Sequence, residues 1–413
     1  MNKIELLAPA GTFEKMQSAF KFGADAVYFA GKKFGLRAFA GNFDDDEIKT
    51  AVEYAHERGK KVYITINILA HEEDFNGLGE YVLSLQNAGV DAVIVSDIGV
   101  ISYIREIAPN LDIHVSTQAN ILNSYSINFL AKMGVKRIIL ARELSLNEIK
   151  EIKKKIPPEI ELETFVHGAM CISYSGRCLL SNYLAGRDSN RGACVQPCRW
   201  QYTITEKSRQ GEQYEIQEDN RGTYILNSKD LCLIEHLSEL KEAGICSFKI
   251  EGRMKSEYYV ATVVNAYHRA LNLLEGKENE KYTLAELKAE TEKASHRRYT
   301  TGFYFGEENK EFLENSMPVQ THEFIAVVLE DAKDGYVKIQ QRNRFKIGDT
   351  LEILSPTNTF NQQIIVEEIK NEKGEIVDDA KIVQQTLYLK TNLKLEKGDF
   401  LRRQLSTTPT PKH

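Results

Sequence analysis

Short apolar runs alternate with longer amphipathic segments through the first two thirds of the chain. Most of the runs follow a glycine, as in Gly23-Ala-Asp-Ala-Val27 and Gly89-Val-Asp-Ala-Val93. Glycine suits that position because the residue after a helix end often takes a positive φ. The runs predict eight strands: Ile4–Leu7, Val27–Ala30, Val62–Ile66, Ala92–Val95, Ile113–Ser116, Arg137–Leu140, Leu162–Val166 and Ser247–Ile250.

The segments between most of these strands have helical period. In the second one, Ile48, Ala51, Val52 and Ala55 form one apolar face after the acidic start at 44–46. The last strand is followed by a predicted helix from Ser256 to about Leu274. Eight strands alternating with helices predict an α/β fold, a TIM-like (β/α)8 barrel. A doubly wound sheet is the alternative, but the first strand is not followed by a Gly-rich dinucleotide fingerprint.

Residues 201–227 interrupt the alternation. Two strand-like runs, Tyr202–Glu206 and Thr223–Leu226, flank a polar loop and predict a hairpin that returns through a helix at Asp230–Ala243. We therefore assign residues 1–275 to the barrel and 168–230 to a Cys-rich loop with an inserted hairpin. Residues 276–320 read as a charged linker with one exposed helix.

Beyond Met317-Pro318 the pattern changes to short strands separated by glycine-containing turns. Five strands are predicted, at Phe324–Leu329, Tyr336–Gln340, Thr350–Leu354, Gln363–Ile369 and Thr386–Leu389. Frequent strands with Asp-Gly turns favour a small β-barrel over residues 321–405. The tail at 406–413 is expected to be disordered.

Composition narrows the class of protein. Apolar residues make up 42% and charged residues 27% of the chain, as in ordinary globular proteins. The first residues enter a strand directly, so we expect no signal peptide. Without an export signal, the six cysteines indicate a reducing cytoplasm. A net charge of −6 argues against bulk affinity for polyanions, so any nucleic-acid contact must use a local basic patch.

Four of the cysteines fall in one stretch: Cys171, Cys178, Cys194 and Cys198. Grouped thiolates are soft ligands for zinc or an iron–sulfur cluster. Structural zinc favours two tight pairs, and only the last two cysteines form one, so we favour a cluster. Zinc and four unconnected buried thiols remain the alternatives.

Polar residues follow the predicted strands, where βα loops of a barrel begin. They are Asn67, Asp97, Thr117, Gln118, Asn120, Arg142, Glu143, Glu163, His167, Glu251 and Arg253. In a barrel these positions meet at one face, so we expect a polar pocket there. The cysteine stretch follows the seventh strand and opens on the same face.

Several sequence blocks carry a resemblance to a known family. They span 163–171, 175–181, 227–231 and 249–253, with further blocks at 7–11 and 296–303. Together they resemble peptidase family U32, the collagenase-like family. The pattern Gly192-Ala193-Cys194 with Cys198-Arg199-Trp200 is most similar to its tRNA hydroxylation branch. The resemblance implies a 4Fe-4S cluster and prephenate-dependent formation of 5-hydroxyuridine at the tRNA wobble position. In other branches the fourth cysteine lies further on, which leaves Cys198 or Cys232 as the fourth ligand.

The resemblance also implies a site for prephenate, a dianion. Charge-assisted hydrogen bonds from cations at the barrel mouth suit its carboxylates. As substrate-binding residues we take Arg142, Arg253, Arg177, Asn67 and Gln118. Lys249, Glu251 and Arg253 alternate along the eighth predicted strand and so share one side. As candidate catalytic residues we take Glu251, Lys249 and Glu163.

The cysteine stretch is also basic. Arg177, Arg187, Arg191, Arg199, Lys207 and Arg209 outnumber Asp188 and Glu206 between residues 171 and 210, and Tyr174, Tyr183, Trp200 and Tyr202 interleave with them. Such a patch suits the splayed bases of a tRNA anticodon loop. The other candidate surface is the C-terminal β domain, with Lys338, Arg342, Arg344 and Lys346.

Two other functions remain open. The family name implies a peptidase, but the chain contains no H-E-x-x-H or G-x-S-x-G motif. A triad needs no local signature, so a peptidase stays an alternative. The third interpretation is a non-catalytic iron–sulfur partner of another hydroxylase.

Overall fold

The structure, a computed structural model, describes residues 3–34, 42–171, 173–175, 177–187, 189, 193–200, 218–219, 222–223, 229–277, 280–306 and 319–405. The chain forms two compact units, described separately here. The barrel unit comprises Met1–Met16, Ala24–Met254 and Arg297–Pro318. The C-terminal unit comprises Gln17–Gly23, Lys255–His296 and Val319–His413.

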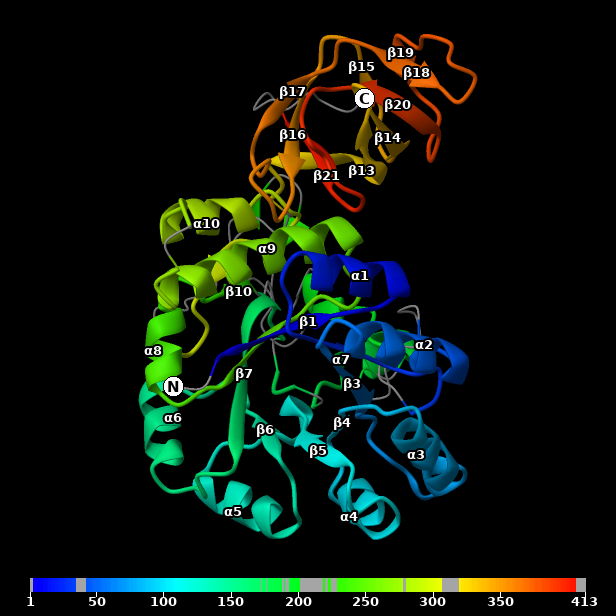
Figure 1. The fold of residues 1–413 in the computed structure, drawn as a ribbon. Helices are drawn as coiled ribbons and strands as arrows, with labels where there is room; N and C mark the ends of the chain where they lie inside the picture. Colours follow the sequence, from blue (N-terminus) through cyan, green and yellow to red (C-terminus); the bar gives the residue numbers. More distant parts are fainter. Residues whose placement is uncertain are drawn as a thin grey trace, which may run out of the picture. The chain divides into compact units, whose positions relative to one another are not determined.

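The barrel unit contains a closed ring of parallel strands, as the apolar runs predict. Its members are β1 (Glu5–Pro9), β2 (Ala26–Phe29), β3 (Lys61–Ile66), β4 (Ala92–Val95), β5 (Asp112–Val115), β6 (Arg137–Ile139), β7 (Glu161–Ala169) and β11 (Ser247–Ile250). Neighbours pair in chain order, as can be followed from β3 to β7 in Figure 1. β11 closes the ring between β7 and β1. The TIM-like (β/α)8 barrel is confirmed.

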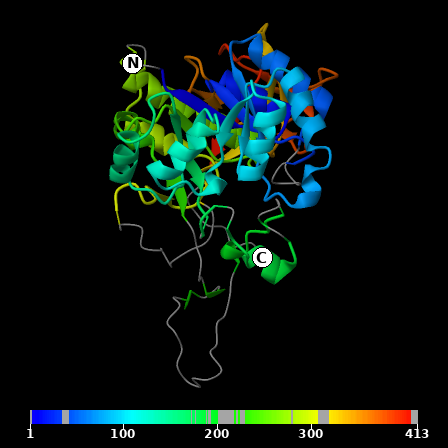
Figure 2. The same cartoon turned by 90° about the horizontal axis from the view of Figure 1, so that it is seen from below.

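Helices of the predicted period follow the strands. They are α1 (Phe13–Lys21), α2 (Asp45–His56), α3 (Leu78–Asn87), α4 (Ile98–Ile107), α5 (Ser124–Lys132) and α6 (Leu146–Lys153). Asp44 caps α2 in a capping box with Glu47, and the four apolar residues predicted for its inner face are its buried residues. Figure 2 shows α2 to α6, coloured blue to cyan-green, arranged around the strands.

The segment after β7 differs from the prediction. Short helix α7 (Leu180–Ala185) lies within the cysteine stretch. The helix predicted from Asp230 begins instead with strand β10 (Asp230–Cys232), and helix α8 covers only Leu237–Glu242. β10 pairs antiparallel with the end of β7 and parallel with β12 (Tyr299–Thr300). A short apolar run cannot be assigned from period alone, and here the last residues of β7, His167–Ala169, supply the strand partner.

Most of the predicted hairpin lies outside the described residues. This holds for Tyr202–Glu206 and for the part of the second strand after Thr223. Within this segment the structure describes one two-stranded pair, β8 (Glu218–Asp219) with β9 (Gly222–Thr223). The tail 406–413 also lies outside the described residues.

The C-terminal unit carries a curled antiparallel sheet of order β17-β16-β21-β13-β14-β20-β18. The strands are β13 (His322–Lys333), β14 (Tyr336–Gln341), β16 (Thr350–Leu354), β17 (Gln363–Ile365), β18 (Ile369–Asn371), β20 (Thr386–Lys390) and β21 (Phe400–Gln404), with β15 (Phe345–Lys346) paired to β19 (Asp379–Ala380). Four of the five predicted strands are confirmed. The run Gln363–Ile369 is wrong as one strand, because it divides into β17 and β18 at opposite edges. The central strand β21 was missed.

Two helices belong to the C-terminal unit. α9 (Glu257–Leu274) begins after its cap Ser256, as predicted. α10 (Leu284–Thr291) was expected to be exposed, but Leu287, Glu290 and Thr291 are buried. Glu290 forms a bidentate ion pair with Arg402 of β21, at 2.6 and 2.9 Å. The charged composition of this helix therefore does not mark a solvated element.

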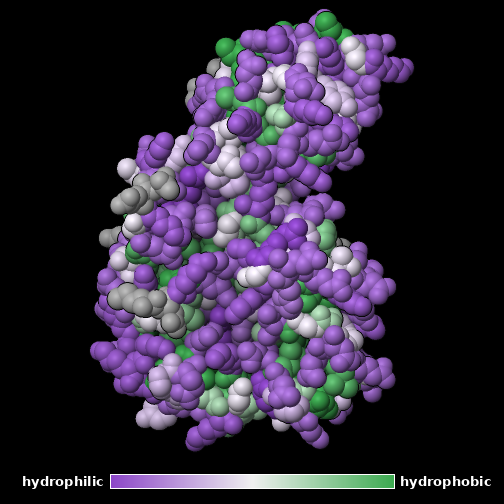
Figure 3. All heavy atoms as spheres, in the orientation of Figure 1, coloured by the Kyte–Doolittle hydropathy of each residue, from purple (hydrophilic) through white to green (hydrophobic). Residues whose placement is uncertain are grey.

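The described helices include none with the length and apolar character needed to cross a bilayer. On the face shown in Figure 3, hydrophilic residues predominate over the barrel unit, and hydrophobic ones are scattered between them.

Candidate active site at the carboxyl ends of the barrel strands

A cavity of about 260 Å³ opens where the barrel strands end. Six of the polar residues predicted to gather there line it: Asn67, Thr117, Gln118, Arg142, Glu251 and Arg253. Tyr28, Thr65, Ser116, Phe165, Lys249 and the segment after β7 complete much of the wall. The expected polar pocket is thus present. Asp97 serves as the cap of α4 instead, accepting a hydrogen bond from the Val100 amide.

The end of β11 contributes Lys249, Glu251 and Arg253 to the cavity. The strand ends at Ile250, so only Lys249 lies within it; the other two follow its last residue. The Tyr28 hydroxyl donates to Glu251 Oε2 at 3.2 Å, and the Lys249 ammonium lies 4.2 Å from the centre of the Tyr28 ring. Tyr28, which sequence reasoning missed, therefore fixes two candidate catalytic side chains.

Glu163 is not among the lining residues. It is fully buried in the barrel interior, where it accepts a hydrogen bond from Lys249 Nζ at 2.9 Å and from Arg137 at 3.1 Å. Arg137 also pairs with Glu5 and with Glu161. Burial lowers the pKa of Lys249 below its ordinary value, while Glu163 acts in the opposite direction. This interior ion network was not predicted, although an arginine opening an apolar strand is a visible signal.

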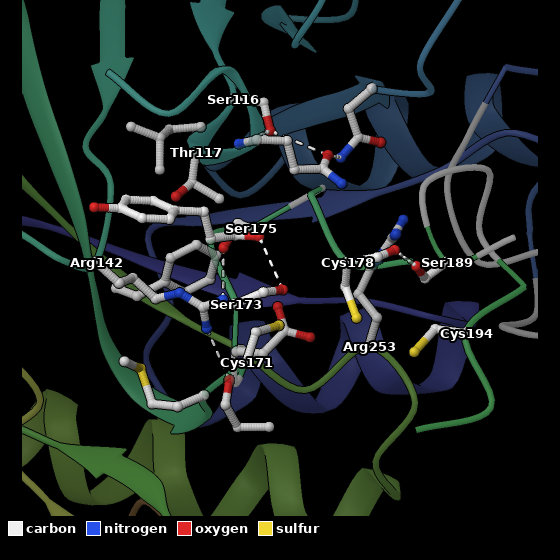
Figure 4. A pocket seen from close by; sticks show the side chains of 18 of the residues that line it. Ser116, Thr117, Arg142, Cys171, Ser173, Ser175, Cys178, Ser189, Cys194 and Arg253 are labelled. Carbon is white, nitrogen blue, oxygen red and sulfur yellow. Dashed lines mark hydrogen bonds between the residues drawn. The ribbon is translucent and has the colours of Figure 1, made fainter. Parts of the chain in front are cut away.

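Arg142 is buried at the end of β6 and held by two acceptors. It donates to the Ala169 carbonyl at 2.8 Å and to Ser175 Oγ at 2.6 Å, as the dashed lines in Figure 4 show. Burial opposes its charge, but Cys171 and Glu251 nearby raise its pKa overall. The guanidinium is therefore a permanent cation in the cavity wall.

Polar side chains on the β3 and β5 side of the cavity are joined to one another. Asn67 Nδ2 donates to Gln118 Oε1 at 2.5 Å, and Ser116 Oγ lies 3.4 Å from the same oxygen. Arg177 does not line the cavity. It is exposed and donates to Asn120 Oδ1 at 2.8 Å, and Asn120 in turn donates to the Ser175 carbonyl.

All four cysteines of the motif line this same cavity. In Figure 4 the sulfurs of Cys171, Cys178 and Cys194 point toward the space that these residues share with Arg253. The Gln196 amide donates to Cys194 Sγ at 3.3 Å. Within the described part of the chain, no three Cys, His, Asp or Glu side chains lie close enough together to share one metal ion.

The two remaining cysteines are not among the lining residues. Cys232 is buried in β10, where it pairs across the ladder with His167. The Cys246 thiol donates to the Leu162 carbonyl at 3.4 Å, and burial raises its pKa to about 11. Both positions suit small core residues rather than cavity ligands.

Comparison with known families identifies the family of the chain. The sequence model of peptidase family U32 matches residues 11–314, and that of the U32 C-terminal domain matches residues 320–402. The chain belongs to peptidase family U32. The resemblance inferred from the motifs is confirmed.

Relatives in the U32 family carry two kinds of name. The tRNA hydroxylation protein P1 of Bacillus subtilis is 40% identical over 405 residues, which are 97% of this chain and 95% of that protein. The tRNA hydroxylation protein P of Escherichia coli is 35% identical over 439 residues, covering 96% and 95%. A protein of Porphyromonas gingivalis named collagenase is 28% identical over 418 residues, covering 98% of each chain.

The cysteine segment of this U32 protein presents aromatic side chains to solvent. Tyr183 on α7 is 87% exposed, and Tyr174 and Trp200 are nearly half exposed. Of the other predicted members of the basic and aromatic patch, Arg177 and Arg187 are described, whereas Arg191, Tyr202, Lys207 and Arg209 lie outside the described residues, as does the side chain of Arg199.

Proposed function

We propose that this U32 protein is a tRNA hydroxylation enzyme that forms 5-hydroxyuridine at the wobble position of tRNA with prephenate as co-substrate. The observation that carries the proposal is the cavity, which combines three buried cations with four cysteines. That the substrate is a tRNA is inferred from the names of the Bacillus subtilis and Escherichia coli relatives. Such an enzyme works in the cytoplasm, where tRNA is.

The cations of the cavity suit the carboxylates of prephenate. Arg142, Lys249 and Arg253 are all buried, and all line the cavity. Arg253 donates to Thr65 Oγ1 at 3.2 Å, which orients its guanidinium toward the β3 side. Charge-assisted hydrogen bonds in a site screened from water are stronger than those at the surface.

The cysteines are proposed to hold a 4Fe-4S cluster through Cys171, Cys178, Cys194 and Cys198. The donor set fits, because four thiols border one cavity and Arg142 and Arg253 lie beside them. Thiolate is the ligand state, and neighbouring cations favour it. A cluster bound there would supply one-electron transfer. Zinc is the alternative occupant.

The target base is proposed to enter from the rim. Asn67 and Gln118 expose amide groups of the kind that pair with the edge of a uracil, and the exposed rings near α7 suit stacking with anticodon bases. These side chains bind and orient the uridine, whereas Lys249 and Glu251 lie where the co-substrate would react.

Two measurements test the proposal. Nucleoside analysis of tRNA from cells lacking the protein should show loss of 5-hydroxyuridine, and reintroduction of the gene should restore it. Anaerobically purified protein should be brown and absorb near roughly 400 nm. Normal 5-hydroxyuridine in the deleted strain, with no other copy of the gene present, would refute the proposal.

A peptidase is the second candidate, because one relative over 98% of the chain is named collagenase. A colourless protein that cleaves gelatin, with cleavage lost in a Cys171→Ala variant, would support that function. A non-catalytic iron–sulfur partner is distinguished by a different result: the pure protein shows the absorbance but modifies tRNA only when a second protein is added.

A further inference from the structure

Lys249 occupies an unusual place for a lysine. Among the residues described around the cavity it is the single lysine, and 3% of its surface is exposed. Its Nζ is held between Glu163 Oε1, at 2.9 Å, and the faces of two rings, Tyr28 at 4.2 Å and Phe165 at 5.5 Å. Such an ammonium is fixed in position and shielded from bulk water, and it belongs to a side chain that lines the cavity.

The surroundings of Lys249 also provide what amine chemistry requires. Burial lowers the pKa of the ammonium, with Glu163 and Glu251 opposing that effect, so the neutral amine is more accessible than in an exposed lysine. Glu163 is a hydrogen-bonded carboxylate at the distance needed to accept the ammonium proton. Arg142 and Arg253 line the same cavity and can hold a carboxylate next to the reacting carbon.

We propose that Lys249 forms an imine with the keto group of a 2-oxo acid bound in the cavity. The inference deepens the proposed function and rests on it, because the side chain of prephenate is a 2-oxo acid. It assigns to Lys249 a covalent role in addition to charge: the lysine fixes the co-substrate through its keto carbon while the arginines hold its carboxylates.

The step balances without any oxidant or reductant. The Lys249 ammonium gives a proton to Glu163, and the free amine attacks the keto carbon, forming the C–N bond while a proton passes from the attacking nitrogen to the carbonyl oxygen. The resulting carbinolamine loses water as its C–O bond breaks, with the leaving hydroxyl protonated by Glu163, and leaves a protonated C=N bond beside the restored Glu163 carboxylate. One water is released, and no electrons are gained or lost.

The competing interpretation is that Lys249 is only a counter-ion for Glu163 and for a substrate carboxylate. Both interpretations predict that loss of the positive charge is harmful. Only the imine predicts a covalent bond between Nζ and the 2-oxo acid, so the test must detect that bond directly.

The test is reductive trapping on the full-length protein, purified anaerobically. Prephenate or pyruvate is added with sodium cyanoborohydride, which reduces an imine to a stable secondary amine, and modified peptides are located by mass spectrometry. We expect one adduct, on Lys249, and none when lactate replaces the 2-oxo acid. Glu163→Gln should slow trapping by roughly 10²-fold, because the proton acceptor is lost.

Two arginine variants complete the design. Lys249→Arg keeps the charge but cannot form the imine, so it should abolish the adduct. Lys15→Arg is the matched control, because Lys15 Nζ lies 3.5 Å from the Arg253 carbonyl but does not line the cavity. That variant should be labelled on Lys249 like the wild type.

The outcomes separate this inference from the proposed function. No adduct on Lys249 in a protein that hydroxylates tRNA overturns the imine and leaves the function standing. An adduct on Lys249 in a protein that leaves tRNA unmodified supports the imine and refutes the function. Labelling spread over surface lysines with Lys249 unmodified overturns the imine.

Discussion

Glu163 is a buried residue that holds two neighbouring cations, Arg137 and Lys249, in position. It has no exposed surface and accepts hydrogen bonds from both Arg137 and Lys249, so its carboxylate lies between two cations inside the barrel. Removing one partner from such a network leaves an uncompensated buried charge, which is far costlier than removing a surface pair. The position of the Lys249 amine therefore depends on a residue that does not line the cavity.

The cysteines give a prediction at the level of single atoms. Alanine at Cys171, Cys178, Cys194 or Cys198 should each remove the absorbance near roughly 400 nm and most of the iron, because each thiol borders the cavity. Alanine at Cys246, whose thiol bonds the Leu162 carbonyl, should retain both. Iron content and absorbance of anaerobically purified variants measure this. Iron lost in Cys232→Ala but kept in Cys198→Ala would make Cys232 the fourth ligand.

His322 in the C-terminal unit gives a pH prediction. Burial, with Arg402 next to it and Lys293 close by, lowers the pKa of His322 from 6.5 to about 4, while Glu352 and Glu290 act in the opposite direction. Between these values the unfolded chain binds the proton that the folded protein excludes. The contribution of neutral His322 to the free energy of unfolding is therefore complete above pH 6.5 and declines as the pH falls toward 4. Lowering the pH from 7.5 to 5 should therefore reduce the free energy of unfolding by about 2 kcal/mol through this side chain.

Urea unfolding followed by circular dichroism at the two pH values measures this loss. His322→Gln should show a smaller loss than the wild type, whatever its absolute stability. His71→Gln, at an exposed histidine, should show the wild-type loss. An unchanged loss in His322→Gln would exclude this side chain as the source.

At the scale of elements, the sequence predicts the parts whose burial is periodic. Every barrel strand is an apolar run of the right length, and ring closure then places the strand ends at one face, which is why the cavity residues could be named in advance. Glu163 was placed with Glu251 at the barrel mouth, but it lies at the start of β7, whereas Glu251 follows the last residue of β11. Each strand residue advances about 3.3 Å, so a residue well before the strand end lies deeper in the barrel.

The elements that the sequence did not predict share one physical cause. They are stabilised by contacts with residues that are distant in the sequence. β21 reads Phe-Leu-Arg-Arg-Gln, and two arginines suggest an exposed segment. Arg402 is nevertheless fully buried in a central strand, because Glu290 and Glu352 accept its hydrogen bonds. A buried ion pair has no local signature, since each half looks like a surface residue by itself.

The ion pair between Glu290 and Arg402 should hold α10 to the sheet. Glu290→Ala should destabilise the C-terminal unit by about 3–5 kcal/mol, because it leaves the Arg402 guanidinium buried with half of its acceptors gone. Urea unfolding of the full-length protein measures the loss. Glu292→Ala, at the end of the same helix, should cost less than about 1 kcal/mol. Equal losses in the two variants would contradict the role given to the ion pair.

A second variant separates charge burial from packing. Replacing both partners, with Glu290→Leu and Arg402→Met, should recover most of the stability lost in Glu290→Ala, because no buried charge is left unpaired. Failure to recover would mean that α10 depends on the shape of the ionic contact itself.

At the scale of the whole molecule, the question is where a chain of net charge −6 could bind a polyanion. In the C-terminal unit three of the four candidate cations are engaged by acids: Lys338 pairs with Glu330 at 2.7 Å, Arg342 with Glu257 at 3.1 Å and Arg344 with Asp379 at 2.6 Å. Arg177, by contrast, donates to the neutral side chain of Asn120. Positive potential should therefore be stronger along the cysteine segment than on the C-terminal sheet.

The last prediction compares these two surfaces with variants of equal charge. Arg177→Gln with Arg187→Gln removes two positive charges from the cysteine segment, and Lys338→Gln with Arg344→Gln removes two from the C-terminal sheet. The first pair should lower tRNA affinity about tenfold at moderate salt and flatten the dependence of log Kd on log salt by about 1.5, because two phosphate contacts are lost. The second pair should change affinity less than about twofold, since acids already offset those cations. Fluorescence anisotropy with labelled tRNA over a salt series measures both, and a larger effect from the second pair would move the RNA site to the C-terminal sheet.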